Sequence, residues 1–285
     1  MGQHHLYGST AHSAPPPETS TGASDGQAVM LRPDVHLPDW TVVRTDAARH
    51  ALGATFEAFD MARKWSAMGE TEDRVWRTVL DLYARAGKAL TLPELAAAVG
   101  VAPDAAAACL QRLRARDLVV LDTKGHIVGA YPFTNDATEH RVDFGSTTVM
   151  AMCVIDALGV GTMLGIDTVI RARCRSYDYD YDYDIEIATR DRGQALALVS
   201  PDSAIVWSGV HYADACATTS LCTVQAFFYS DQHLHAWRRN DQPGVHGFRL
   251  SVDEALQVGW VVFVPMLQPG AVAPDATSSS TTARR

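Results

Sequence analysis

Long hydrophobic runs are missing from this sequence of 285 residues. No stretch approaches the roughly 20 consecutive apolar residues that a membrane-spanning helix requires. Residues 1–25 are polar and lack the apolar core of a signal peptide. An excess of positive charge is missing as well: the formal net charge is −9, which argues against bulk attraction to nucleic acid or anionic lipid. We therefore expect a cytoplasmic protein that does not enter a membrane and for which nucleic acid is a disfavoured partner.

Closely spaced cysteine pairs are also missing. The five cysteines are Cys109, Cys153, Cys174, Cys216 and Cys222, and no two of them form a CxxC pair. An odd number of cysteines in a chain of this length is not typical of a disulfide framework. A zinc ribbon and a thioredoxin motif are therefore disfavoured, and we expect free thiols.

Composition divides the chain into four segments. Residues 1–37 and 268–285 are rich in Gly, Ser, Thr, Pro and Ala. Such segments bury too little apolar surface to offset the entropy lost on ordering, so we expect disordered tails. Residues 38–131 are predicted to be mainly helical, and residues 132–267 to alternate short strands with helices. The predicted fold class is α+β: a helical, winged-helix-like domain followed by a mixed α/β catalytic domain with a mainly antiparallel sheet.

The helical part has the element order of a winged helix. Apolar spacing predicts helices over 46–67 and 71–86, and the capping box Thr91-x-x-Glu94 opens a short helix before a third one over 103–116. A predicted hairpin, 118–131, follows. Winged helices often bind DNA, but Lys plus Arg and Asp plus Glu number eight each between residues 70 and 131. Because basic residues do not outnumber acidic ones here, a structural role is favoured over DNA recognition.

The stretch Val149–Gly159 is almost wholly apolar, yet it carries the thiol of Cys153 and the carboxyl of Asp156. We expect a helix here between two strands, which would put both groups on one face, one turn apart. A lone Asp among apolar neighbours must find a partner or change its protonation state. A second thiol, Cys222, lies in another apolar run, which is predicted to be a strand over 224–229. Two sulfurs and one proton-bearing oxygen in apolar surroundings indicate soft-metal chemistry with a proton to deliver.

Ordinary structural interpretations exist for the same residues. A single cysteine on an apolar helix or strand is usually a small buried hydrophobe, and a buried Asp is often a helix cap. The alternating segment Tyr177–Asp184 is interpreted as a solvated hairpin or edge strand. A calcium site there is disfavoured, because the segment lacks the glycine turn and the ligand spacing of a calcium loop. The final helix is predicted over 252–264, opened by Ser251.

Taken together, several motifs resemble the organomercurial (alkylmercury) lyase family over roughly residues 70–267. They are Tyr131-Pro132-Phe133, Met152-Cys153-Val154-Ile155-Asp156-Ala157-Leu158, Ser220-Leu221-Cys222 and Phe227-Phe228. The resemblance implies an enzyme that cuts a carbon–mercury bond to give a hydrocarbon and Hg(II). It also implies a winged-helix-like domain before a mixed α/β catalytic domain.

The resemblance assigns roles residue by residue. It implies that Cys153, Cys222 and Asp156 are catalytic and hold mercury transiently, and that Cys174 is structural. Thr223 stands where some family members carry an additional cysteine. Cys109 and Cys216 match nothing in the family, and the Tyr-Asp segment and both tails lie outside the resemblance.

Elementary chemistry supports this assignment. Mercury is soft, so thiolates outcompete oxygen and nitrogen ligands. Two thiolates make the mercury-bound carbon basic, and the carbon then leaves when an acid protonates it. Asp156 can take a proton from a cysteine and pass it on, and burial would help it to hold that proton at neutral pH.

The resemblance implies no built-in cofactor, external thiols that remove Hg(II), and a mercuric reductase downstream. Two alternatives stay open. One is a soft-metal-binding or sensing protein that binds DNA through the winged helix. The other is a lyase-like enzyme adapted to a different thiol-dependent reaction.

Overall fold

The computed structural model describes residues 29–33, 35–176, 185–242 and 244–267. The C-terminal tail, most of the N-terminal tail and the Tyr177–Asp184 insert lie outside the described residues. The prediction of disorder is wrong for the described part of residues 29–37, where Val29–Arg32 (β1) and Val35–Leu37 (β2) pair antiparallel. Leu31 and Leu37 are fully buried there. Their alternation with polar residues is a strand signal that the average composition of the tail conceals.

Five helices follow β1 and β2, after a short 3-10 turn, Trp40–Val42. They are α1 (Asp46–Phe59), α2 (Met61–Trp65), α3 (Glu70–Ala86), α4 (Leu92–Val99) and α5 (Pro103–Ala115). The single helix predicted over 46–67 is broken at Asp60, whose φ of 54° is left-handed and ends α1. The break lets Phe59 and Trp65 pack edge to face, with ring centroids 5.2 Å apart. The capping box of α4 is confirmed, because Thr91 N–H donates to Glu94 Oε2 at 2.8 Å.

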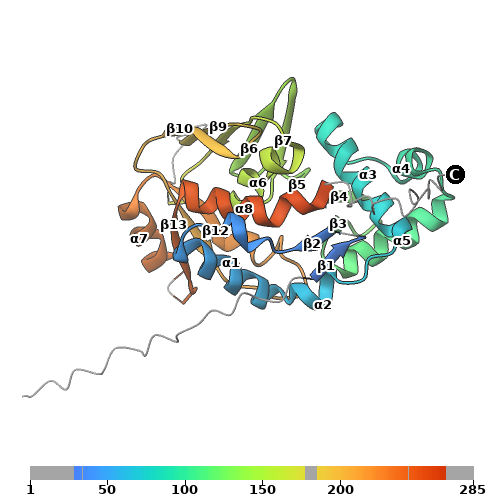
Figure 1. Cartoon of the computed structure of the whole chain (residues 1–285), viewed down its shortest axis with the longest axis horizontal. Coiled ribbons are helices and arrows are strands. Elements are labelled where there is room, and N and C mark those ends of the chain that lie inside the picture. Colours follow the sequence, from blue (N-terminus) through green and yellow to red (C-terminus); the bar gives the residue numbers. More distant parts are fainter. Residues whose placement is uncertain (1–28, 34, 177–184, 243, 268–285) are drawn as a thin grey trace, which may run out of the picture.

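An eight-stranded antiparallel sheet, ordered β10-β9-β8-β6-β7-β5-β4-β3, extends from β9 and β10 at the top of Figure 1 to β4 and β3 in its middle. Its strands are β3 (Val119–Leu121), β4 (Ile127–Ala130), β5 (Phe133–Thr134), β6 (His140–Phe144), β7 (Thr147–Ala151), β8 (Val169–Ala172), β9 (Ile185–Arg190) and β10 (Ala195–Ser200). The predicted hairpin is β3–β4, and β4 goes on to pair with β5 across the predicted boundary at 131–132. The α+β class with antiparallel strands is confirmed, while the winged-helix identity of the helical part stays a prediction.

The prediction of a helix over 149–159 is wrong in its first part. Residues Thr147–Ala151 form β7, and the helix, α6, runs from Val154 to Leu164. Thr147, Thr148 and Val149 are β-branched and fit a pleated strand, whereas a short apolar run does not by itself distinguish a strand from a buried helix. Cys153 therefore lies at the junction of β7 and α6, in extended conformation.

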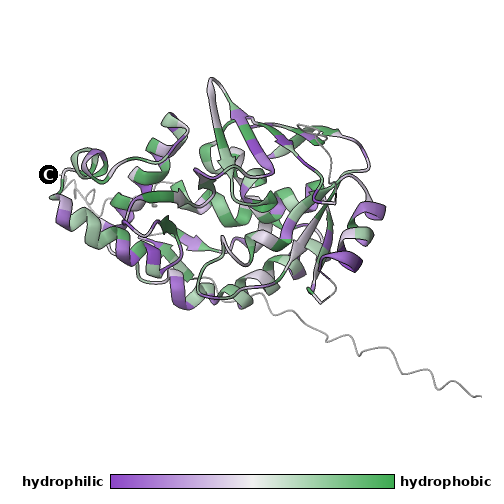
Figure 2. Ribbon diagram, turned by 180° about the vertical axis from the view of Figure 1, so that it is seen from behind, coloured by the Kyte–Doolittle hydropathy of each residue, from purple (hydrophilic) through white to green (hydrophobic). Residues whose placement is uncertain are grey.

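The long C-terminal helix α8 (Val252–Leu267) runs through the middle of the molecule, between α1 and β2 on one side and α6 on the other (Figure 1). A second sheet, β12-β11-β13, and helix α7 complete the chain; their bounds are β11 (Ile205–Gly209), β12 (Gln225–Phe228), α7 (Asp231–Asn240) and β13 (Gly247–Ser251). Close packing of α6 on α8 depends on Gly159, because a Cβ there would lie 2.1 Å from Cδ2 of Phe263. Figure 2 shows hydrophobic residues along these central elements and hydrophilic ones toward the outer helices.

Among the described residues, no single helix is long and apolar enough to cross a membrane. Only α4 and α5 taken together reach that length and composition, and they are bent by 103° at the break between them. Both helices pack against α3.

Candidate active site

The start of α6 positions the first thiol and the carboxyl. Cys153 is the N-cap residue and Asp156 lies in the first turn, three residues later. N-cap and third-position side chains face each other in a capping box, so the predicted closeness holds for a different reason than a shared helix face. The positive end of the helix dipole also favours anionic forms of both groups.

The second thiol comes from a segment that is distant in the sequence. Cys222 begins a 3-10 turn, Cys222–Val224, directly before β12, rather than lying in a strand. The loop before it is anchored by the buried carboxylate of Asp117, which accepts hydrogen bonds from Ala217 N–H at 2.7 Å and from the Tyr212 hydroxyl at 3.1 Å. Thr218 N–H donates to the hydroxyl of Tyr131 at 2.9 Å. These contacts fix the path of the loop that presents Cys222.

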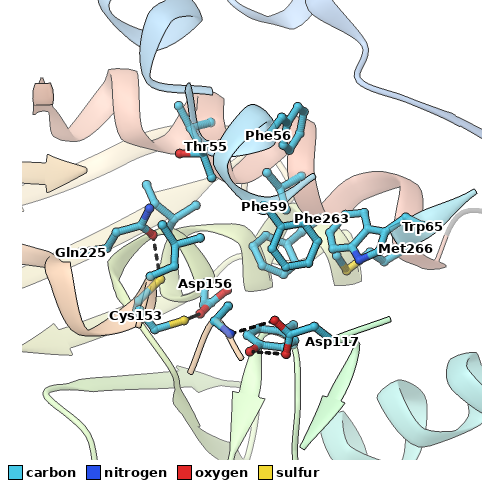
Figure 3. A pocket seen from close by; sticks show the side chains of 17 residues that line it. Thr55, Phe56, Phe59, Trp65, Asp117, Cys153, Asp156, Gln225, Phe263 and Met266 are labelled. Carbon is cyan, nitrogen blue, oxygen red and sulfur yellow. Dashed lines mark hydrogen bonds between the residues drawn. The ribbon is translucent and has the colours of Figure 1, made fainter. Parts of the chain in front are cut away.

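The structure brings the three predicted site residues together. Sulfur and carboxylate ligand atoms of Cys153, Asp156 and Cys222 all lie within 4.8 Å of one another. The Cys222 thiol donates to Asp156 Oδ2 at 3.7 Å, and the Cys153 thiol donates to Gln225 Oε1 at 3.2 Å (Figure 3). All three residues are at most 5% exposed. Two soft donors and one carboxylate therefore share one nearly dry site.

Burial sets the protonation of this cluster. It raises the pKa of Asp156 to about 7, although hydrogen bonds with the two thiols and with the Cys153 backbone N–H act to lower it. Burial also raises the pKa of the Cys153 thiol. A hydrogen bond to Cys153, together with burial, raises the pKa of Cys222 well above its usual value. At neutral pH the cluster thus holds two thiols and a carboxyl group that takes up or releases a proton readily.

A cavity of about 70 Å³, here called the apolar chamber, opens beside the cluster. This volume is several times the roughly 10–15 Å³ that one water molecule needs. Its walls come chiefly from α1, α2 and α8 and are formed by Phe56, Phe59, Trp65, Val262, Phe263 and Met266 (Figure 3). An apolar group of small size fits such a lining, whereas a charged group would lose its hydration there.

Sequence reasoning missed several residues of the site. Gln225, which accepts a hydrogen bond from the Cys153 thiol, is 3% exposed, and the only sequence signal for it was a lone amide within an apolar run. Asp117 also lines the chamber and lies in no quoted motif, whereas Tyr131, another lining residue, was noted only as part of Tyr131-Pro132-Phe133 and was given no role. Of the apolar neighbours expected to bury Asp156, only Ile155 lines the chamber, because α1 and α8 supply most of its wall.

The remaining cysteines lie outside the cluster. Cys174 is buried and accepts a hydrogen bond from Tyr229 N–H at 3.3 Å, which fits the predicted packing role. Cys109 is buried in α5, and Cys216 is partly exposed. Thr223 is exposed, and its hydroxyl donates to the carbonyl of Ser220 at 2.6 Å.

Comparison with known proteins agrees with the motifs. Residues 133–263 match the family model of alkylmercury lyase (MerB). The fold is similar to that of the mercury-bound form of MerB2, with a TM-score of 0.59 and 22% sequence identity over 79% of this chain and 100% of that one. No curated protein matches the chain in sequence. The resemblance to the organomercurial lyase family, and with it the prediction of a lyase enzyme, is confirmed.

Proposed function

We propose that this relative of the alkylmercury lyases cleaves the carbon–mercury bond of alkyl or aryl mercury compounds by protonolysis. Cys153 and Cys222 bind the mercury, and Asp156 carries the proton. The observation that supports this most directly is the convergence of two buried thiols and one buried carboxyl within 4.8 Å beside an apolar chamber.

The first step is capture of the substrate, R–Hg–X. Mercury replaces the proton of one thiol, because a soft metal stabilises the thiolate that burial alone disfavours. Cys222 is hydrogen-bonded to Asp156 at 3.7 Å, so its proton has a direct route to the carboxylate. The second thiol then displaces X, which leaves with a proton as HX.

The second step is cleavage. Asp156, now a carboxylic acid, gives its proton to the mercury-bound carbon, and the electron pair of the carbon–mercury bond becomes the new carbon–hydrogen bond. The overall change is R–Hg–X plus two thiols to R–H, HX and a mercury ion bridging Cys153 and Cys222. A pKa of about 7 suits Asp156 to both halves of this transfer at neutral pH.

The substrate fits the surroundings of the cluster. The organic group lies in the apolar chamber against the aromatic rings of Phe59 and Phe263, and the apolar walls disfavour water near the carbon during protonation. The Hg(II) product leaves with external thiols, and a mercuric reductase is the proposed acceptor downstream.

DNA sensing receives less support. Two of the three arginines at the end of α5, Arg112 and Arg116, interact with the protein itself. Arg116 Nε donates to Glu72 Oε1 at 2.6 Å and Arg116 Nη1 donates to the carbonyls of Lys64 and Ser66, both at 2.8 Å. Arg112 also faces Glu72, at 3.5 Å. We therefore assign this part of the chain a structural role.

The decisive experiment incubates the purified full chain with one equivalent of phenylmercuric acetate and measures benzene. We expect benzene from the wild type and strong loss in Cys153→Ser, Cys222→Ser and Asp156→Asn. Cys174→Ser, a change of buried thiol outside the cluster, is the matched control and should retain release. Release by all three cluster variants at the wild-type rate would refute the assignment, and no release by the wild type would refute the proposed activity.

A further inference from the structure

Cys222 lies between two cavities. One is the apolar chamber. The other, here called the basic cavity, has a volume of about 680 Å³ and is defined by Glu139, His140, Arg173, Arg175, Cys222 and Thr223. Among the residues that the structure describes, Cys222 alone lines both cavities. The mercury-binding thiol can therefore be approached from a side that the organic substrate does not use.

The charge of the basic cavity differs from that of the whole chain. Among the described residues, its lining holds two guanidinium groups and one carboxylate, a formal charge of +1, in a protein of net charge −9. Arg175 donates from Nε to Glu139 Oε2 and from Nη1 to the carbonyl of Thr223, both at 2.6 Å, and is thereby fixed beside Cys222. Arg173 is exposed. Guanidinium groups in such a setting select carboxylates.

His140 adds an unsatisfied polar group to the same lining. The side chain is 1% exposed, and neither ring nitrogen has a hydrogen-bond partner among the described residues. Burial and the neighbouring Arg175 lower the pKa of His140 to about 3, so the ring is neutral and offers one donor and one acceptor. Buried polar atoms are rarely left unsatisfied, which points to a ligand with its own polar hydrogen or lone pair.

We propose that the basic cavity binds a small thiol bearing a carboxylate, which takes Hg(II) from Cys222. This inference rests on the proposed lyase function. The carboxylate pairs with Arg173 and Arg175, and the thiol reaches the mercury from the side opposite the apolar chamber. A ring nitrogen of His140 accepts a hydrogen bond from the incoming thiol, whose proton then passes to the Cys222 sulfur.

The transfer balances without a further reagent. The sulfur of the incoming thiol bonds to mercury, the bond between mercury and Cys222 breaks, and the proton of the incoming thiol ends on the Cys222 sulfur. A second thiol repeats the exchange at Cys153. The products are Hg(SR)₂ and two restored cysteine thiols, with no change in oxidation state.

The test measures mercury removal rather than cleavage. Wild-type protein is loaded with one equivalent of mercuric chloride and mixed with 3-mercaptopropionate, 2-mercaptoethanol or cysteamine at equal thiolate concentration. Protein-bound mercury is then followed by rapid gel filtration and metal analysis. We expect the anionic thiol to remove mercury about five- to tenfold faster than the neutral one, the effect of about one favourable ion pair. Added salt should reduce this preference.

Variants identify the residues that cause the preference for the anionic thiol. Arg173→Gln and Arg175→Gln should each reduce the preference for the anionic thiol, and Arg173→Glu should shift it toward cysteamine. Arg171→Gln is the matched control: Arg171 lies on β8, just before Arg173 in the sequence, pairs with Asp143 and Glu186, and does not line the cavity. The proposal would be overturned if the wild type lost mercury to all three thiols at equal rates. It would also be overturned if the Arg173 and Arg175 variants kept the full preference for the anionic thiol.

The benzene assay separates this inference from the proposed function. Benzene released in a single turnover, together with removal rates that ignore thiol charge, would refute the basic cavity alone. Failure of mercury to load onto the wild type would refute both proposals. His140→Phe, which keeps a flat ring against Phe227 but removes both nitrogens, should raise the thiol concentration needed for half-maximal removal.

Discussion

The raised pKa of Asp156 predicts a pH-dependent difference in stability between the wild type and Asp156→Asn. A carboxyl group whose pKa rises from 3.8 in the unfolded chain to about 7 in the folded one binds more protons when folded. Its contribution is therefore fully present below the unfolded pKa and is lost as pH rises through about 7. Ionising the buried group costs about 4 kcal/mol of folding stability, because a tenfold change in proton affinity corresponds to about 1.36 kcal/mol.

Between pH 5 and pH 8 the wild type should lose about 2–3 kcal/mol through Asp156, by the same linkage relation. Asparagine has no charge to bury, so Asp156→Asn should escape this loss and gain stability relative to the wild type as pH rises. The two thiols titrate above this range because their pKa values are raised. His140 contributes equally to both proteins and cancels in the difference.

Urea unfolding at pH 5, 6, 7 and 8, followed by tryptophan fluorescence, measures this difference. Asp231→Asn is the control. Its ion pair with Arg249 lowers the pKa of Asp231, so both states are ionised above pH 5 and no such trend should appear. Parallel curves for the wild type and Asp156→Asn across the range would show that Asp156 is not a buried, proton-holding group, and the proposed proton carrier would be lost.

Two further changes test the scaffold of the site. Gly159→Ala should destabilise the protein by about 1–3 kcal/mol, since the new methyl group would overlap the ring of Phe263; Gly69→Ala, with nothing within 4 Å, is its control in thermal unfolding. Asp117→Asn keeps a residue type that tolerates the φ of 56°. However, the asparagine NH₂ group cannot accept hydrogen bonds from the groups that donate to the Asp117 carboxylate. This change should cost about 1–3 kcal/mol and slow benzene release, and unchanged stability would contradict the anchoring role of Asp117.

The sequence predicted the closeness of Cys153 and Asp156 because three residues of separation is short in any compact conformation. The helix boundary was wrong because periodicity alone does not tell whether a short apolar run forms a strand or a buried helix. Its apolar surroundings and the family resemblance singled out Cys222, but the residues alone could not place it beside Cys153, because no local pattern indicates which distant segment will meet a helix N-terminus.

The walls of the chamber illustrate the same limit. Phe59 and Phe263 each belong to an amphipathic or apolar helix whose side chains look like ordinary core. Their role in a cavity follows from how α8 packs against both α1 and α6, a tertiary arrangement that periodicity does not encode. The hairpin over 118–131 was easier to predict, because turn residues and strand patterns are local.

The continuous hydrogen bonding from β3 through β4 to β5 has a practical consequence for anyone shortening this protein. A fragment starting at residue 132 would lose β3 and β4 and would leave β5, only two residues long, as a bare outer edge. The same cut would remove Tyr131 and Asp117, the groups that tether the Cys222 loop. Trimming for a sensor or an immobilised catalyst should therefore spare everything from Val29 to Leu267.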